Sequence, residues 1–298
     1  MIKILKRISV GVNINWFKIR LSEKVSGQEH LKKMTTITQN NRITSLFNNK
    51  KKNILSVFYT AGFPKINDTV IIAQHLQKSG ADIIEIGIPF SDPVADGPTI
   101  QESNKIALDN GMNLRLILDQ VKEIRKSVDI PIILMGYLNP VMQYGIEKFC
   151  IDAVNAGVDG LILPDMPMEE YQHDYKDLFD SQGMSNTFLI SPTTSEQRIR
   201  TIDSVSNGFI YAVAASSTTG AKGEFAKEQI DYFKRLKAMK LSNPILIGFG
   251  ISNHETFSVA SSHGAGAIVG SAFVNLIKAS TNLEKDIHDF VRSIKEGK

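Results

Sequence analysis

The stretch SGADIIEIG (residues 79–87) contains the pattern that decides the fold: a glycine that ends a helix is followed at once by a short apolar, β-branched run. The chain repeats this pattern weakly in AGVDGLILP (156–164) and HGAGAIVGS (263–271). Glycine readily adopts the left-handed conformation in which many helices end. Each stretch therefore marks the passage from a helix to a strand, and together they predict repeating βα units.

Short apolar runs alternate with longer amphipathic stretches from Asn41 to the C-terminus. Nearly continuous apolar composition indicates strands that are buried on both faces, as in a parallel sheet covered by helices. Eight such units over residues 41–298 predict an α/β fold, a single-domain (β/α)8 TIM barrel, with a doubly wound sheet as the alternative. The predicted strands are residues 54–60, 82–87, 131–136, 160–164, 187–191, 209–214, 244–249 and 267–270.

One of the amphipathic stretches, NDTVIIAQHLQKSG (67–80), shows both ends of a helix. It begins at an Asn/Asp cap and stops at Gly80. Ile72, Ala73 and Leu76 fall on one face, which we expect to pack against the strands.

Residues 1–40 do not share this organisation. ISVGVNINWF (8–17) alternates apolar and polar residues with a period of two, unlike the Arg-rich amphipathic helix of a mitochondrial targeting segment. We expect residues 1–40 to be a non-homologous extension, disordered or absent from the native product, and residues 41–298 to be the catalytic domain. A targeting segment is the alternative for the extension, and Met34 is a plausible alternative start.

The charge distribution excludes some partners. Residues 1–33 carry eight lysines and arginines against two glutamates, so the remaining chain is mildly acidic although the formal net charge is +3. An acidic body without a basic stripe argues against nucleic-acid binding, and no stretch approaches the ~20 apolar residues of a membrane span. The single cysteine, Cys150, excludes an intrachain disulfide and predicts a reducing compartment, the cytoplasm.

Glu85 is the unusual residue of the second predicted strand. Side chains alternate along a strand, so Ile83 and Glu85 point one way while Ile84 and Ile86 point the other. The larger apolar set should face the helices, which places Glu85 inside the barrel. A carboxylate buried without a partner raises its pKa, as a general acid near neutral pH requires. A glutamate satisfied by local hydrogen bonds is the structural alternative.

A second carboxylate, Asp96, follows in the loop PFSDPVADGPT (89–99). The loop is long enough to fold back over the barrel mouth, where catalytic residues of such barrels gather. Two carboxylates in different environments commonly divide acid and base roles. Asp92 in the same loop is interpreted equally well as a turn residue or as a contact to a partner.

Glycines at the ends of three predicted strands indicate a phosphate site. Barrels frequently bind phosphate after strands seven and eight, where backbone N–H groups and a helix N-terminus approach the anion. Tight turns are the alternative interpretation of these glycines. The predicted residues are Thr219 and Gly220 after strand six, Gly248 and Gly250 after strand seven, and Gly270 and Ser271 after strand eight.

The strands also lack certain catalytic residues. None of the eight contains a lysine, which a Schiff-base aldolase needs, and the six histidines lie in the extension or in predicted helices. We therefore expect carboxylate chemistry without a metal or bound cofactor, on a substrate that supplies its own electron sink.

These motifs together resemble one family. IEIGIPFSDPVADGPTIQ (84–101) is highly specific, and with FYTAGFP, MGYLNPVMQYG, LILPDMP, GFGIS and IVGSAFV it is similar to the α subunit of tryptophan synthase over residues 41–298. The resemblance implies retro-aldol cleavage of indole-3-glycerol phosphate to indole and glyceraldehyde 3-phosphate. It implies that Glu85 moves protons at indole C3 and at the glycerol hydroxyl. It also implies that Asp96 accepts a hydrogen bond from the indole N–H and stabilises the positively charged tautomer of the ring.

The same resemblance implies the substrate pocket. Tyr211 matches the active-site tyrosine, and Phe58 and Phe249 match walls of the indole pocket. Ser217 stands where the family more often has glycine, which makes closure of the loop after strand six less certain than the chemistry.

The resemblance also implies a partner, a pyridoxal-phosphate-containing β subunit in an α2β2 tetramer. PFSDP (89–93) and YLNPV (137–141) would face it. Three alternatives are considered. A phosphosugar isomerase barrel would share the phosphate site but needs an acid on strand one, and ILSVFYT (54–60) has none. Indole-glycerol-phosphate synthase needs a strand lysine, which is missing. A non-catalytic partner of a β subunit is harder to exclude from the sequence.

Overall fold

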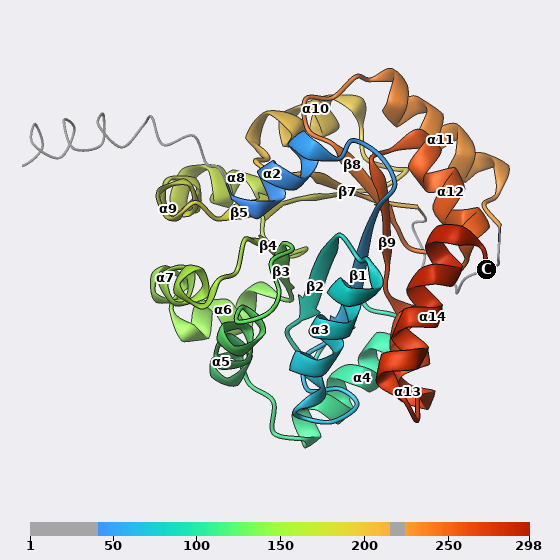
Figure 1. The fold of residues 1–298 in the computed structure, drawn as a ribbon. Helices are drawn as coiled ribbons and strands as arrows, with labels where there is room; N and C mark the ends of the chain where they lie inside the picture. Colours follow the sequence, from blue (N-terminus) through green and yellow to red (C-terminus); the bar gives the residue numbers. More distant parts are fainter. Residues whose placement is uncertain (1–40, 215–223) are drawn as a thin grey trace, which may run out of the picture. The chain divides into compact units, whose positions relative to one another are not determined.

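The structure, a computed structural model, describes residues 41–214 and 224–298 (Figure 1). The described residues belong to one compact unit. The predicted extension, residues 1–40, lies outside the described residues, so its nature stays a prediction.

Parallel strands form a barrel at the centre of this unit, with helices around it (Figure 1). The sheet order is β5-β4-β3-β2-β1-β9-β8-β7-β6. Since β5 and β6 are consecutive in the chain, the two ends of this order meet and the barrel closes. The strands are β1 (Ile54–Thr60), β2 (Ile83–Gly87), β3 (Ile132–Met135), β4 (Gly160–Ile162), β5 (Ser185–Thr187), β6 (Leu189–Ile190), β7 (Ile210–Val213), β8 (Ile245–Gly248) and β9 (Gly266–Val269).

All eight predicted strands are present, which confirms the TIM barrel. The fifth differs, because Phe188 separates β5 from β6. β5 pairs with β4 and β6 pairs with β7, and the Phe188 carbonyl accepts a hydrogen bond from the Tyr211 N–H at 3.0 Å. The fifth strand thus changes partner within a few residues. The buried strand β5, Ser185–Thr187, is polar. A search for apolar runs therefore does not find its first two residues.

The helices follow the strands in alternation. The predicted helix over 67–80 is confirmed as α3, which ends at Gly80 with a left-handed φ of 95° and buries Ile72, Ala73 and Leu76. The predicted cap at its start is not formed, because Asn67 has a helical conformation and its side chain makes no capping hydrogen bond. The helices are α2 (Arg42–Asn49), α3 (Asp68–Ser79), α4 (Pro98–Asp109), α5 (Leu114–Ile124), α6 (Leu138–Tyr144), α7 (Ile146–Ala156), α8 (Met168–Glu170), the π-helical turn η1 (Tyr171–Tyr175), α9 (Lys176–Gln182), α10 (Glu196–Val205), α11 (Lys227–Ala238), α12 (His254–His263), α13 (Ser271–Ala279) and α14 (Leu283–Glu296).

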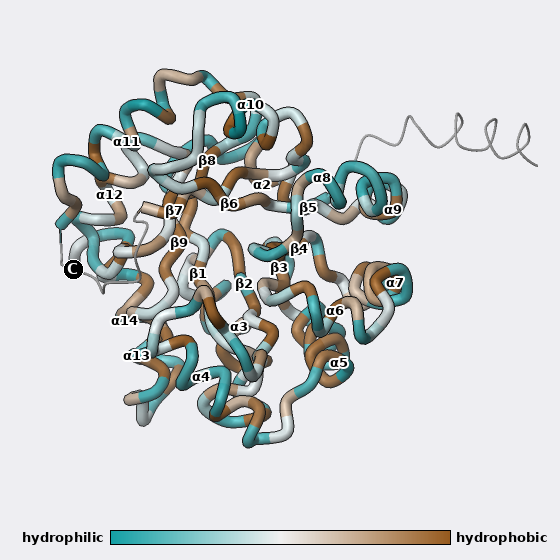
Figure 2. Tube along the Cα trace, turned by 180° about the vertical axis from the view of Figure 1, so that it is seen from behind, coloured by the Kyte–Doolittle hydropathy of each residue, from teal (hydrophilic) through white to brown (hydrophobic). Residues whose placement is uncertain are grey.

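Two apolar cores result from this arrangement. The larger core lies between the strands and the helices and contains Ile84, Ile86 and the buried thiol of Cys150. The smaller core fills the barrel interior and includes Ile83. The hydropathy colouring shows the apolar strands inside a more polar ring of helices (Figure 2).

Helix α2 closes one end of the interior. Ile43 and Phe47 of α2 belong to the interior core, and the Phe47 ring lies 5.8 Å from that of Phe209, just before β7. The strands begin at this end of the barrel. Catalytic residues of such barrels lie at the opposite end, where the strands finish.

Two acids, one buried and one partly buried, are fully paired at the α2 end. Asp159 is only 4% exposed and accepts bonds from Arg125, from Arg42 at 3.0 Å and from the Ile132 N–H at 2.9 Å. Asp82, just before β2, has an equivalent set of partners. They are Lys50 at 2.6 and 2.7 Å, the Leu55 N–H at 2.9 Å and Lys295 at 3.4 Å. These contacts tie strands and helices together where the barrel begins.

Candidate active site

Glu85 lies inside the barrel, as the alternation along β2 predicts. Its strand neighbours Ile84 and Ile86 contact the helices, whereas Ile83, two residues before it, belongs to the interior core. Glu85 pairs in register with Phe58 of β1, and its side chain is completely buried. Strand alternation in a closed barrel thus fixes the direction of this carboxyl group.

The surroundings of the Glu85 carboxyl group are almost entirely apolar. Oε1 accepts a hydrogen bond from the Ser56 hydroxyl at 2.6 Å, and Oε2 is buried without a hydrogen-bond partner. Within residues 41–214 and 224–298, no ion pair includes Glu85. Burial raises the pKa of Glu85 from 4.5 to about 7, against the opposing effect of the Ser56 bond. A carboxyl group in this state can both give and take a proton near neutral pH.

Asp96 lies in the loop between β2 and α4. Its Oδ2 accepts a hydrogen bond from the Tyr137 hydroxyl at 3.3 Å, and the same hydroxyl accepts one from the Ala95 N–H at 3.0 Å. Burial raises the pKa of Asp96, while the bonds from Tyr137 and Asn104 oppose that rise. Tyr137, which follows β3, therefore holds this segment of the loop in place. Asp96 is partly exposed, unlike Glu85.

Tyr211 of β7 links the two carboxylates electrostatically. Its pKa lies well above 10, chiefly because the phenol is buried, and the negative charges of Glu85 and Asp96 raise it further. Both acids thus lie close enough to influence one phenol. Their catalytic roles stay a prediction.

Aromatic side chains lie close against glycines of the barrel wall. A Cβ atom on Gly87 would lie 2.6 Å from Cζ of Phe58, and one on Gly248 would lie 2.3 Å from Cε2 of Tyr211. Phe249 adds a third ring, with its centroid 6.2 Å from that of Tyr211. The predicted phosphate residue Gly248 therefore also leaves room for the tyrosine. Phe58 is the in-register neighbour of Glu85 on β1.

Backbone geometry after β8 differs from that of an ordinary turn. Phe249 has φ of 66° and Gly250 has φ of 81°, so a bulky residue and a glycine adopt the left-handed conformation in succession. Left-handed non-glycine residues cluster at functional sites, although Asn53 and Lys240 adopt the same conformation outside this site. The position of Phe249 beside Tyr211 is what makes a ligand-contacting role for this turn reasonable.

The N-terminus of α13, directly after Gly270, is free of a side-chain cap. By contrast, α12 begins with Asn253, whose side chain accepts from the Thr256 N–H at 2.9 Å. The first N–H groups of a helix lack partners within the helix. Ser271 and the residues after it therefore present donors suited to an anion.

Some predicted site residues cannot be placed. Thr219, Gly220 and Ser217 lie outside the described residues, so their contribution stays a prediction.

Sequence reasoning missed two residues of the site, Ser56 and Tyr137. Ser56 is a buried polar residue in the otherwise apolar run ILSVFYT, the same signal that drew attention to Glu85. Tyr137 carried no such signal, because its role depends on how the loop after β2 folds back.

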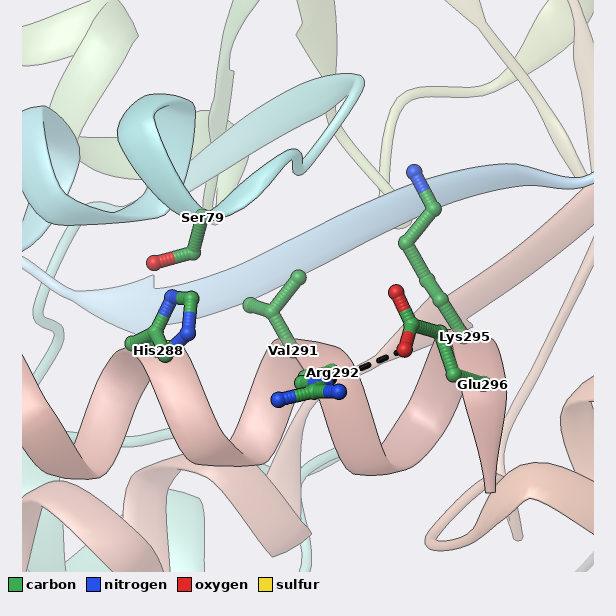
Figure 3. A pocket seen from close by; sticks show the side chains of 6 residues that line it. All are labelled: Ser79, His288, Val291, Arg292, Lys295 and Glu296. Atoms are coloured by element: carbon green, nitrogen blue, oxygen red, sulfur yellow. Dashed lines mark hydrogen bonds and ion pairs between the residues drawn. The ribbon is translucent and has the colours of Figure 1, made fainter. Parts of the chain in front are cut away.

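A separate pocket lies on the outside of the barrel, between Ser79 of α3 and residues of α14 (Figure 3). Its cations are already engaged: Lys295 donates to the Gly80 carbonyl at 2.6 Å, and Arg292 pairs with Glu296 at 3.0 Å. His288 completes the polar lining. This pocket is remote from the acids of the interior in the fold, since it belongs to the outer helices.

Two further observations concern the described part of the chain. No group of three or more His, Cys, Asp or Glu side chains there is arranged to hold a metal ion. None of its helices combines the length and apolar character that crossing a membrane requires.

Comparison with known proteins identifies the family. The family model described as tryptophan synthase alpha chain matches residues 45–297. The tryptophan synthase alpha chain of Parabacteroides distasonis is 52% identical over 256 residues, covering 86% of this chain and 100% of the relative. That of Flavobacterium psychrophilum is 53% identical and covers 85% of this chain and 99% of the relative.

Solved structures agree with this assignment. The crystal structure of the tryptophan synthase alpha chain from Legionella pneumophila has a TM-score of 0.76 at 34% identity, covering 86% of this chain and 96% of that one. A tryptophan synthase structure from M. tuberculosis, in an aminoacrylate-bound form, has a TM-score of 0.75 at 27% identity and covers 86% and 99%.

Proposed function

Because the chain belongs to the tryptophan synthase alpha chain family, a family of lyases that cleave indole-3-glycerol phosphate to indole and glyceraldehyde 3-phosphate, we propose that Glu85 and Asp96 divide the proton handling of this reaction. One observation carries the proposal. The Glu85 carboxyl group is completely buried, has no counterion among the described residues, and has a pKa of about 7.

Glu85 would act twice in one turnover. Its protonated form donates a proton to indole C3, which places a positive charge on the ring nitrogen. The resulting carboxylate then takes the proton of the hydroxyl group on the adjacent glycerol carbon. The bond between this carbon and C3 breaks, its electron pair returns to the ring, and the glycerol carbon becomes the aldehyde. The products are indole and glyceraldehyde 3-phosphate, and Glu85 is protonated again.

Asp96 would stabilise the charge that appears between these steps. An ionised carboxylate near the indole N–H favours the positively charged ring. The partial exposure of Asp96 and its bonds from Tyr137 and Asn104 favour ionisation relative to Glu85. The difference between the two environments thus supports different roles for the two acids.

The remaining predicted residues would bind the substrate. Phe58, Tyr211 and Phe249 supply aromatic surface for the indole ring beside Glu85. Gly250, Gly270 and Ser271 would hold the phosphate through the turn after β8 and the uncapped start of α13. Thr219 and Gly220 would complete this site from outside the described residues.

We further propose a β subunit as partner, in an α2β2 tetramer with pyridoxal phosphate bound by the β subunit and no cofactor in this chain. Exposed apolar residues adjoin both predicted contact segments: Val94 is 90% exposed and Met142 is 56% exposed. A cytoplasmic location stays a prediction, in keeping with the free, buried thiol of Cys150.

Indole release tests the proposed function. The assay compares the wild type with Glu85→Gln and Asp96→Asn, each with and without a β subunit. We expect the wild type to release indole at a rate that the β subunit raises, and both variants to release it far more slowly. Wild-type rates in both variants would contradict the roles given to the two acids. A wild type that releases no indole under either condition would instead favour a non-catalytic partner of the β subunit.

A further inference from the structure

Ser56 is the only described side chain that bonds to the Glu85 carboxyl group. It belongs to β1 and pairs in register with Ile83, whereas Phe58, two residues further along β1, pairs with Glu85. Ser56 and Glu85 therefore face the barrel interior from adjacent strands, and Ser56 lies two residues before the in-register partner of Glu85. Both are completely buried, and the hydroxyl-to-Oε1 distance is 2.6 Å.

The bond makes the two carboxyl oxygens of Glu85 unequal. Oε1 is the acceptor for Ser56, whereas Oε2 is equally inaccessible to solvent but has no hydrogen-bond partner. An oxygen that already accepts a hydroxyl proton is the poorer position for the acid's own proton. In the protonated state, the proton therefore belongs on Oε2.

The in-register neighbour of Glu85 on β1 is Phe58, whose ring lies against the backbone of Gly87, two positions after Glu85 on β2. Ser56 lies two residues before Phe58, nearer the start of the strands. A half-turn of the protonated carboxyl group would bring its own O–H, instead of an oxygen without a proton, against the Ser56 hydroxyl. Such a turn would disturb the one hydrogen bond that the group makes among the described residues.

We propose that Ser56 is a positioning residue that anchors Oε1 of Glu85, so that Oε2 alone carries the proton to and from the substrate. This inference rests on the proposed role of Glu85 as the proton-transferring acid. It adds a determinant that lies on a different strand and does not itself touch the reacting atoms. Without the anchor, the carboxyl group samples orientations in which the proton points away from indole C3.

Two consequences distinguish this role from a merely structural one. Removing the Ser56 hydroxyl lets the Glu85 carboxyl group adopt several orientations, which lowers kcat about tenfold. This loss is smaller than the loss expected when the acid itself is removed. Removing the hydroxyl also removes a bond that favours the ionised carboxylate, so the pKa of Glu85 rises above its value of about 7. Because protonated Glu85 starts the reaction, the fall of kcat/KM at high pH then moves to still higher pH.

The other titratable groups of the interior do not explain such a movement. The pKa of Tyr211 lies well above 10, so its phenol stays neutral over this range. Asp96 accepts hydrogen bonds from Tyr137 and Asn104, whereas the Ser56 hydroxyl donates to Glu85.

The test measures kcat, KM and the pH profile of kcat/KM for indole release, with a β subunit present, in wild type, Ser56→Ala, Ser56→Thr and Ser185→Ala. Ser185 is the matched control, because it is also a completely buried strand serine but bonds to Asn41 at 2.8 Å. We expect Ser56→Ala to lose about tenfold in kcat with KM little changed, and its alkaline limb to move upward. Ser56→Thr, which keeps the hydroxyl, should return both values toward the wild type, and Ser185→Ala should change neither.

Two results would overturn the inference. A Ser56→Ala profile that coincides with the wild type, while Glu85→Gln is inactive, would remove the positioning role and leave the proposed function intact. An active Glu85→Gln enzyme would remove both. If Ser56→Thr does not fold, the alkaline limbs of the kcat/KM profiles of Ser56→Ala and Ser185→Ala are compared. A shift to higher pH in Ser56→Ala alone supports the positioning role, and the absence of such a shift contradicts it.

Discussion

Two buried acids of the same barrel have opposite environments. Asp159, where the barrel begins, accepts bonds from two arginines and a backbone N–H. Glu85, within β2, accepts one bond from a neutral hydroxyl and leaves one oxygen without a partner. Both are almost inaccessible to solvent, with exposures of 4% and 0%. Burial alone therefore does not separate a structural acid from a catalytic one.

Asp159 and Glu85 differ in the groups that replace water around the carboxylate. A buried charge is tolerated when opposite charges and hydrogen bonds replace water, and the arginines provide both for Asp159. Glu85 has no such partners and responds by holding its proton up to a pKa of about 7. The same contrast occurs along a single segment, since Asp82 is three residues before Glu85 and is bonded by Lys50, Lys295 and the Leu55 N–H.

Glu85→Gln should produce the largest effect on catalysis. The substitution keeps the shape and an acceptor for Ser56 but removes the transferable proton, so kcat should fall at least about 1,000-fold. The free energy of unfolding should not decrease, because an uncompensated buried acid is lost. Indole release and chemical denaturation measure the two quantities. A stability loss as large as that of an Asp159 variant would show that Glu85 is structural.

Asp159→Asn should lower the stability of the fold and leave catalysis almost unchanged. Arg125 and Arg42 would lose their counterion in a mostly buried site, which lowers the free energy of unfolding by about 3 kcal/mol. The pKa of Arg125 is already lowered to about 10 by burial, so the guanidinium depends on its acid. Denaturation gives the stability, and kcat per folded molecule should stay within about twofold of the wild type. A large fall in kcat with unchanged stability would break the comparison.

Asp96→Asn should have an intermediate effect on catalysis and almost none on stability. The residue is partly exposed, and an amide can still accept the bond from Tyr137. Loss of the negative charge removes stabilisation of the positive indole ring, so kcat should fall about 100-fold. Steady-state kinetics with a thermal-unfolding control measures both. A loss that equals or exceeds that of Glu85→Gln would reverse the order of importance proposed for the two acids.

Lys295→Met should have the smallest effect. Lys295 donates to the Gly80 carbonyl at 2.6 Å, but Asp82 keeps Lys50 and the Leu55 N–H as partners. The expected loss is about 1 kcal/mol of unfolding free energy, without a change in kcat. Denaturation of this variant beside Asp159→Asn measures the difference. Equal losses would mean that the number of remaining partners does not determine the effect.

The sequence was sufficient to predict most of the fold and the direction of the acids. Glycine-terminated helices followed by apolar runs marked the βα units, and strict alternation along β2 placed Glu85 inside the barrel. The division of the fifth strand at Phe188 escaped prediction, because the register of β5 and β6 depends on their different neighbours. Local composition does not contain that information.

The partners of the two acids were harder to predict than the acids themselves. Ser56 is 29 residues from Glu85 in the chain and Tyr137 is 41 residues from Asp96, so their bonds depend on strand stagger and loop path. A polar residue in an apolar strand was visible at Ser56. Its partner became known only from the register of β1 and β2.

The pH dependence of the stability difference between wild type and Glu85→Gln tests the central claim most directly. The pKa of Glu85 is about 7 in the folded protein and about 4.5 when unfolded, so the folded state binds more protons between these values. Wild-type stability should therefore fall, relative to the variant, by up to about 3 kcal/mol as pH rises from about 4.5 to about 7, and then stay level. Denaturation curves of the two proteins that run parallel across this range would contradict the account.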